Sequence, residues 1–442
     1  MKKLNRRQFL KNSGLISLAG LGGVQIGIGN TFLKGTVNNN KDFLIYIFLY
    51  GGMDGLNMVP PISGANYNEY ANVLRPNLHI PNSTALSLNG ISDFGLHPNA
   101  TGFQNLYNQG KMAIIHATGM LEANRSHFES AAMLEQGKQS VSLNYGTGWI
   151  TRYFNSSLST PNDALIPTYL PMYDSTDAVL GDPSALIMGS PQEFSLNYGF
   201  WAWEDAMTAT ISDIYANPNN LEELIAHQTL NAAEIVKNID WNNYVPDNSV
   251  VYPTTGLGEN LKNVAQMYKS NVDLEVAYVP LGGWDTHINQ GTGTTGTYAE
   301  LVSELCDAIK AFYDDMSANH SGKFTIIVQS EFGRRSYEND SNGTDHGYAN
   351  PMFVIGDNVN PGFYGTFPGL ALNQLYEEQD VAVTTDYRHV VAEVLMKRMQ
   401  NRFLGYIFPL YNNYSPLGIV NGTQSTPVYD FDYDALFSNG FD

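Results

Sequence analysis

Cysteine is almost absent from this sequence, whose 442 residues include only Cys306. A single cysteine excludes a disulfide within the chain and any zinc or iron–sulfur site built from several thiolates. Cys306 lies in the apolar pattern LVSELCDAIKAF, which predicts a helix with a buried thiol. With one thiol and no Gly-x-Gly-x-x-Gly fingerprint after a strand pattern, the sequence gives little support to a redox protein.

Charged residues are also scarce, at 15% of the chain, and positive ones are the scarcer sign. There are 23 Lys and Arg against 43 Asp and Glu, which gives a formal net charge of −20. A body this acidic repels phosphate backbones, so no nucleic-acid partner is expected. An anionic substrate would need a local positive centre, such as a metal ion. The hydrophobic fraction of 43% is enough for a large core, and the 12% of aromatic residues argues against disorder.

The amino terminus has the pattern of a targeting segment. Arg6 and Arg7 are followed by Phe-Leu and then by an uncharged, glycine-rich stretch from residue 12 to residue 33, which resembles a twin-arginine export signal. The glycines make this stretch weakly hydrophobic and a poor helix former, although its length would also allow a retained membrane anchor. We therefore expect residues 1–34 to direct export to the periplasm or cell envelope, and no stable membrane span in the mature chain.

The remaining sequence alternates between two kinds of pattern. Continuous apolar runs predict strands buried on both faces, and amphipathic patterns between them predict helices. This alternation predicts an α/β fold with a largely parallel central sheet flanked by helices. The expected strands are 43–50, 112–118, 274–281, 324–330 and 351–356, and the expected helices are 98–110, 126–137, 297–316 and 386–399. Outside this pattern we expect a linker at 35–42, an irregular cap insertion at 140–260 and an acidic, aromatic tail at 403–442 beyond the 43–402 domain.

Acidic residues and histidines gather where the expected strands end. Ligands of doubly wound sheets bind at the carboxyl ends of the strands, because the loops converge there. Asp285 and His287 are two positions apart, so on an extended segment both side chains point to the same side and can share one metal ion. Together with His346 they form an Asp/His/His set that suits a divalent metal such as zinc. Asp54 and Glu331 also follow expected strands.

Two further motifs have alternative interpretations. Ser126 lies three residues before Glu129 at the start of an expected helix, which is the spacing of a capping box. A serine at a helix amino terminus could also act as a nucleophile, although the spacing alone favours capping. Arg334 and Arg335 follow an expected strand and could clamp an anionic group, or could pair with nearby acidic residues.

The ordered motifs resemble those of a bacterial family called domain of unknown function 1501. They are strand-GGMDGLN, FGLHPNATGFQNLYNQGKMAIIHATG, RSHFESAAMLEQG, GGWDTH, SEFGRR, DHG before a strand, and TDYRHV, and they cover residues 43–400. That family is grouped with the alkaline phosphatase and sulfatase superfamily. The resemblance therefore implies an alkaline phosphatase-like fold.

The resemblance also implies roles for single residues. Asp54 would help to hold one metal, Ser126 would be the nucleophile at the head of a helix, and Asp285, His287 and His346 would hold the other metal. The sequence departs from the superfamily where Phe332 replaces a metal-binding histidine and Glu331 replaces an aspartate. One metal site is therefore complete in this comparison, and the other is depleted unless His127 or Asp345 contributes.

These observations predict an exported, metal-dependent hydrolase acting on a phosphate or sulfate ester of a small molecule or glycan. A divalent metal would activate Ser126 or a water molecule, Asp54 and Glu331 would complete the site, and Arg334 would neutralise the ester. The alternative is a non-catalytic envelope protein that binds a glycan or a protein on a degenerate form of the same fold. The sequence gives no sign of the oligomeric state.

Overall fold

The structure, a computed structural model, describes residues 42–143, 145–157, 166–191, 204–215 and 221–430. The expected export signal and residues 35–41 of the expected linker lie outside the described residues. In the part of the chain that is described, no helix is both long enough and apolar enough to cross a bilayer.

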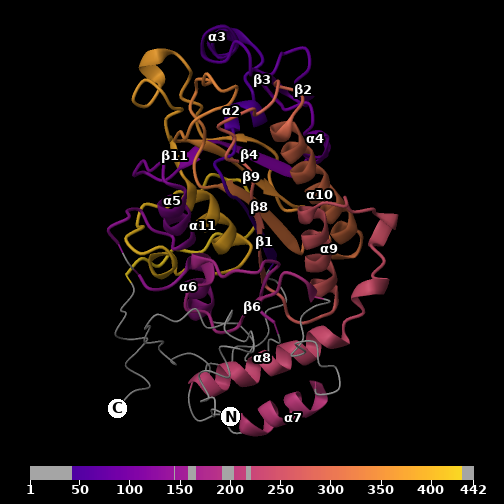
Figure 1. Ribbon diagram of the computed structural model, residues 1–442. Helices are drawn as coiled ribbons and strands as arrows, with labels where there is room; N and C mark the ends of the chain where they lie inside the picture. Colours follow the sequence, from indigo (N-terminus) through magenta and orange to yellow (C-terminus); the bar gives the residue numbers. More distant parts are fainter. Residues whose placement is uncertain (1–41, 144, 158–165, 192–203, 216–220, 431–442) are drawn as a thin grey trace, which may run out of the picture.

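A large central sheet organises the molecule (Figure 1). It has nine strands in the order β10-β4-β9-β8-β1-β7-β5-β6, with β11 paired to β4. Neighbouring strands run parallel, except that β9 is antiparallel to both β4 and β8. The expected α/β class with a largely parallel sheet is thus confirmed. The strands are β1 (Phe43–Leu49), β4 (Met112–Gly119), β5 (Thr168–Leu170), β6 (Ala185–Ile187), β7 (Val276–Leu281), β8 (Phe324–Ser330), β9 (Asn350–Ile355), β10 (Gly362–Tyr364) and β11 (Thr385–Asp386). A separate hairpin pairs β2 (Leu86–Leu88) with β3 (Ile91–Leu96).

Both faces of the sheet are buried, which explains why its strands have continuous apolar sequences. Along β1, Phe43, Ile45, Ile47 and Leu49 pack into one hydrophobic cluster, whereas the residues between them pack into another. The first cluster lies under α4 (Thr101–Asn108), α9 (Gly256–Lys269) and α10 (Thr297–His320), and it includes the buried thiol of Cys306. The second lies under α5 (His127–Glu135), α6 (Trp149–Ser156), α11 (Tyr387–Lys397) and α12 (Leu404–Ile407). The four expected helices are all present, as α4, α5, α10 and α11.

The 140–260 segment differs from the expected cap. Its short strands β5 and β6 extend the central sheet beyond β7, so part of the segment belongs to the sheet itself. Its helices α7 (Glu204–Ile214) and α8 (Leu221–Asn238) lie at the bottom of Figure 1. The loops that follow β1 lead to α2 (Gly55–Met58) and α3 (Gly64–Glu69), which lie at the top. The helices α7 and α8 are therefore at the end of the sheet opposite the carboxyl ends of its parallel strands.

The expected tail also begins inside the body. Leu404, Ile407, Phe408 and Tyr411 are buried against the sheet face that carries α5 and α11. The packed domain therefore continues past residue 402, because this stretch supplies part of its hydrophobic core. The acidic end of the tail, residues 431–442, lies outside the described residues.

Candidate metal centre

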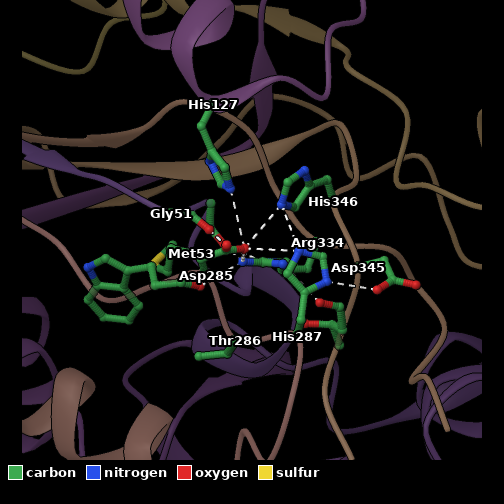
Figure 2. Close-up of polar contacts among 12 residues, drawn as sticks. Gly51, Met53, His127, Asp285, Thr286, His287, Arg334, Asp345 and His346 are labelled. Atoms are coloured by element: carbon green, nitrogen blue, oxygen red, sulfur yellow. Dashed lines mark hydrogen bonds and ion pairs between the residues drawn. The ribbon is translucent and has the colours of Figure 1, made fainter. Parts of the chain in front are cut away.

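The topology brings four residues, three from loops and one from the start of a helix, to one edge of the sheet. Asp285 and His287 follow β7, and His127 begins α5. His346 precedes β9, and because β9 runs antiparallel to β8, the start of β9 lies at the edge where β8 ends. Residues that follow parallel strands and a residue that precedes an antiparallel one therefore meet at the same edge. Figure 2 shows the three histidines gathered around Asp285.

One carboxylate oxygen lies at the centre of this group. Oδ1 of Asp285 is 3.0 Å from Nε2 of His346, 3.1 Å from Nε2 of His287 and 3.3 Å from Nε2 of His127. One ligand atom each from His127, Asp285 and His346 lie within 4.8 Å of one another. Ligands bound at about 2.0–2.2 Å to one tetrahedral zinc ion lie roughly 3.3–3.6 Å apart, which is close to the distances between Asp285 and the histidines.

The far nitrogen of each imidazole is held by an acceptor. Nδ1 of His127 lies 2.8 Å from Oε1 of Glu331, and Nδ1 of His287 lies 2.8 Å from Oδ1 of Asp345. Nδ1 of His346 lies 2.7 Å from the carbonyl oxygen of Arg125. Carboxylates and carbonyls only accept hydrogen bonds, so each Nδ1 carries a proton. In the neutral form of each ring, Nε2 then directs its lone pair toward Asp285.

This arrangement leaves lone pairs that need a cation. Nε2 of His287 lies 2.8 Å from Nε2 of His346, and two lone pairs facing each other at that distance repel unless a proton or a metal lies between them. Nε2 of His127 is buried and has no hydrogen-bond partner among the described residues. Histidines oriented through Nδ1 by carboxylates or carbonyls, with Nε2 free, are typical of metal ligands. The residues present therefore fit a divalent ion of the zinc class.

Charges around the group tune its ionisation. Burial raises the pKa of Asp285, but the hydrogen bond and the positive charge of Arg334 outweigh this effect and lower the pKa to about 2. Asp285 is therefore an anion at neutral pH. Burial lowers the pKa of His346, which keeps this ring neutral. The hydrogen bond to Glu331 raises the pKa of His127, so a proton competes with any metal there.

Glu331 supports the group rather than pointing a free oxygen into it. Its side chain is fully buried, and Oε1 accepts from the backbone N–H of Gly51 at 2.7 Å as well as from His127. Its other oxygen accepts from the Ser330 hydroxyl at 3.0 Å. The predicted ligand role of Glu331 is thus replaced by that of a group that positions His127. Phe332, where the resemblance implies a histidine, packs its ring 4.9 Å from His127 and 5.0 Å from His346, measured between ring centroids.

The first glycine after β1 is required by the close approach of two loops. Gly51 has φ of +119°, and a Cβ on it would lie 2.4 Å from the backbone nitrogen of Asp285. A side chain at this position would push the loop that carries Asp285 away from the sheet edge.

Arg334 is not available as a substrate clamp. Its side chain is buried, and Nη2 donates to Oδ1 of Asp285 at 2.5 Å and to the carbonyls of Gly51 and Trp284. Nε donates to the carbonyl of Gly52, and Nη1 donates to that of Thr344. The guanidinium thus ties three loops together and fixes one oxygen of Asp285.

Asp54 lies in a different, fully buried network. Both of its oxygens accept from Nη1 of Arg75, at 2.7 and 2.6 Å, and Oδ2 accepts from Gln290 at 2.6 Å. Among the described residues its side chain has no contact with Asp285 or the three histidines, so the structure does not join Asp54 to the metal centre. The sequence around Arg75 has no pattern that could have announced this ion pair.

Ser126 immediately precedes His127 at the start of α5. Its hydroxyl makes no capping hydrogen bond within the helix, and its backbone N–H donates to Asn124 at 2.8 Å. The expected capping box is therefore absent. Asn124 also donates to Glu129, the residue that should have completed the box. The part played by Asn124 could not be predicted from the sequence, because Ser126 matches the capping pattern better.

Comparison with known proteins supports part of the sequence interpretation. The model of the family described as "Protein of unknown function (DUF1501)" matches residues 265–402. The predicted family resemblance is confirmed. The match begins at residue 265, so it leaves out the strands β1 to β6. It includes Asp285, His287, Glu331, Arg334 and His346. No curated protein sequence matches the chain.

Several solved structures share a distant likeness with this chain. The C-terminal periplasmic domain of EcEptC from Escherichia coli, solved with zinc, is 10% identical, with 73% of this chain and 74% of that chain covered and a TM-score of 0.31. Ps i-CgsB, in complex with k-i-k-neocarrahexaose, is 10% identical, with 80% and 71% covered and a TM-score of 0.37. A protein of the alkaline phosphatase superfamily from Vibrio parahaemolyticus is 10% identical, with 82% and 71% covered and a TM-score of 0.32. At such TM-scores the function has to be argued from this chain's own residues.

Proposed function

We propose that this chain is an exported hydrolase of phosphate or sulfate esters that uses one divalent ion of the zinc class. The ion would be held by Asp285, His127, His287 and His346. The observation that carries the proposal is the convergence of three Nε2 atoms on Oδ1 of Asp285, each with its Nδ1 held by an acceptor.

The protein residues have distinct parts in this proposal. A divalent ion bound there would polarise an ester oxygen and lower the pKa of a water molecule. Asp285 remains ionised beside Arg334, so it contributes negative charge to the ligand set at neutral pH. Ser126 is the nucleophile that the chain itself offers, and the first N–H groups of α5 can face negative charge that develops next to it. Replacing Ser126 with alanine separates attack by this hydroxyl from attack by water.

Metal analysis of the purified protein tests the proposal. We expect close to one zinc ion per chain, and loss of that ion when Asp285→Ala and His346→Ala are combined. His320→Ala is the matched control, since His320 lies at the far end of α10 and its ring packs on Tyr268. We also expect turnover of an aryl phosphate, phosphodiester or aryl sulfate that depends on the metal. A wild-type protein without stoichiometric metal, prepared with zinc present, would remove the proposal.

A non-catalytic binding protein is the second candidate, and one observation favours it. Asp54 was expected to complete the site and Arg334 was expected to neutralise the ester, but both make buried structural contacts instead. On this alternative the protein binds its metal and a glycan or protein ligand but turns over no ester. Metal-dependent turnover that is lost in Ser126→Ala or His346→Ala excludes it.

A further inference from the structure

Two arginines beside the metal centre have hydrogen-bond donors that the protein does not use. Nε of Arg125 donates to Oδ2 of Asp380 at 3.0 Å, and Nη2 donates to the same oxygen and to Glu377 at 2.7 Å. Nη1 of Arg125 has no hydrogen-bond partner among the described residues. The guanidinium of Arg335 makes no hydrogen bond and no ion pair within the described part of the chain, and its Nε is buried.

The two arginines face the same turn. The backbone N–H of Ser336, next to Arg335, donates to the carbonyl of Gln379 at 2.9 Å, which places Arg335 beside the turn that carries Glu377 and Asp380. Hydrogen bonds from Arg125 are the main cause that lowers the pKa of Glu377, and the charge of Arg335 adds to this effect. Both guanidinium groups therefore act on one exposed carboxylate.

The same arginines border the metal centre. The carbonyl of Arg125 holds Nδ1 of His346, and the backbone N–H of Arg335 donates to the carbonyl of Asp345 at 2.9 Å. Asp345 in turn holds Nδ1 of His287. Arg125 thus contacts one histidine of the centre directly, and Arg335 is linked to another through Asp345.

Glu377 is placed so that another anion can replace it. Its side chain is 49% exposed, and it pairs with only one arm of Arg125. It lies in a turn where Glu377 and Glu378 have φ of +51° and +58°, a left-handed conformation that is unfavourable for residues with a side chain. An ion pair this exposed contributes little to stability, so displacing the Glu377 carboxylate has a small cost.

We propose that Arg125 and Arg335 form a subsite for an oxyanion group, with Glu377 as the internal anion that a ligand displaces. The ligand group is a carboxylate, sulfate or phosphate, which two guanidinium groups can bind through paired hydrogen bonds. Once Glu377 is displaced, the unused donors of both guanidinium groups can bind the incoming anion. This last step rests on the proposed function: the substrate of the hydrolase then carries a second acidic group beside its ester.

Equilibrium dialysis with radiolabelled inorganic sulfate tests the subsite at constant ionic strength. The protein is first treated with a chelator, so the result does not depend on metal binding or on the proposed hydrolase activity. Each hydrogen bond to a charged group contributes roughly 1.5–3 kcal/mol, so we expect Arg335→Gln to weaken sulfate binding about tenfold or more. Glu377→Gln, which removes the competing anion, should bind sulfate several-fold more tightly than the parent, because it removes like-charge repulsion. Arg402→Gln, an exposed arginine whose guanidinium lies over Phe403, should behave as the parent.

Two controls keep the result interpretable. Arg125→Ala would leave the buried Asp380 without a cation, so Arg125→Lys is used instead of Arg125→Ala. Arg125→Lys should weaken sulfate binding while the circular dichroism spectrum stays unchanged. Competition by unlabelled phosphate and acetate distinguishes a general oxyanion subsite from one specific to sulfate. Equal sulfate affinities of the parent, Arg335→Gln and Glu377→Gln would overturn the proposal, even if the metal centre is confirmed.

Discussion

Replacing Glu331 with glutamine removes the negative charge behind His127 while keeping the size of the side chain. Oε1 of Glu331 lies 2.8 Å from Nδ1 of His127, and its side chain is fully buried, so water cannot take over its role. The amide oxygen of glutamine can still accept this hydrogen bond, but a bond to a neutral acceptor is about half as strong as one to a carboxylate. Loss of a partner behind a histidine ligand costs about 10–100-fold in metal affinity.

We expect the lower end of this range, since geometry is kept and only charge is lost. The expected loss is about tenfold in zinc affinity, or about 1.4 kcal/mol. Competition with a chromophoric chelator measures this change. Glu304→Gln is the matched control. Glu304 lies in α10, on the face of the sheet opposite α5, and accepts a hydrogen bond from the backbone N–H of Leu257 at 2.9 Å. If Glu331→Gln binds zinc within a factor of two of both the parent and the control, the inferred role of Glu331 is wrong.

The same substitution has a signature in the metal-free protein. The hydrogen bond to Glu331 is the largest cause of the raised pKa of His127, so this pKa should fall in Glu331→Gln. A raised histidine pKa stabilises the fold fully below the unfolded value of 6.5, and this contribution disappears as the pH rises through the folded pKa. The difference in stability between parent and variant should therefore shrink above that pKa. NMR titration of the His127 ring provides the measurement.

Three further substitutions test the structural roles of single residues. Asp54→Asn leaves Arg75 buried without a full charge partner and should lower the free energy of unfolding by about 3–5 kcal/mol. The zinc content of the folded protein should stay unchanged. Loss of zinc without loss of stability would show that Asp54 is a metal ligand after all. Gly51→Ala should cost about 3 kcal/mol or more in chemical denaturation, against about 1 kcal/mol for Gly90→Ala, whose φ is also positive, at +79°, but whose Cβ would meet no atom within 4 Å. Equal costs would contradict the close contact with the Asp285 loop. Burial lowers the pKa of His97 and His116 to about 4. The free energy of unfolding should therefore decrease as the pH falls from 6.5 to 4, by about 1.4 kcal/mol per pH unit for each histidine. His116→Gln should reduce this slope by half, and an unchanged slope would show that His116 is not the buried neutral group described here.

The sequence predicted the main elements of the fold because they are long and buried on both faces. β1, β4 and β8 are continuous apolar runs, and such runs occur where helices cover both sides of a sheet. β5 and β6 were missed because each has only three residues, too few for a recognisable pattern. The antiparallel direction of β9 was not expected either, since strand direction depends on tertiary connections.

The candidate metal centre was partly predictable for a related reason. Asp285, His287 and His346 lie directly after or before strands, and strand ends meet at one edge whatever the rest of the chain does. The partners of Asp54 and Arg334 could not be found in this way. Arg75 is a distant partner of Asp54, and Arg334 is satisfied mainly by backbone carbonyls, which every residue carries.

The position of Ser126 shows a further limit of the sequence. A capping box is defined by spacing, but here the side chain of Asn124 bonds both to the backbone of Ser126 and to Glu129. A competing side chain two residues upstream replaces the expected hydrogen bonds, and spacing alone does not reveal the competition.

Anomalous diffraction at the zinc absorption edge, from crystals grown with zinc, tests the metal centre most directly. We predict one strong peak within about 2.0–2.2 Å of Oδ1 or Oδ2 of Asp285 and of Nε2 of at least two of the three histidines. The same peak should be absent from crystals of Asp285→Ala combined with His346→Ala. A zinc peak elsewhere with none among these four side chains would contradict the proposed centre.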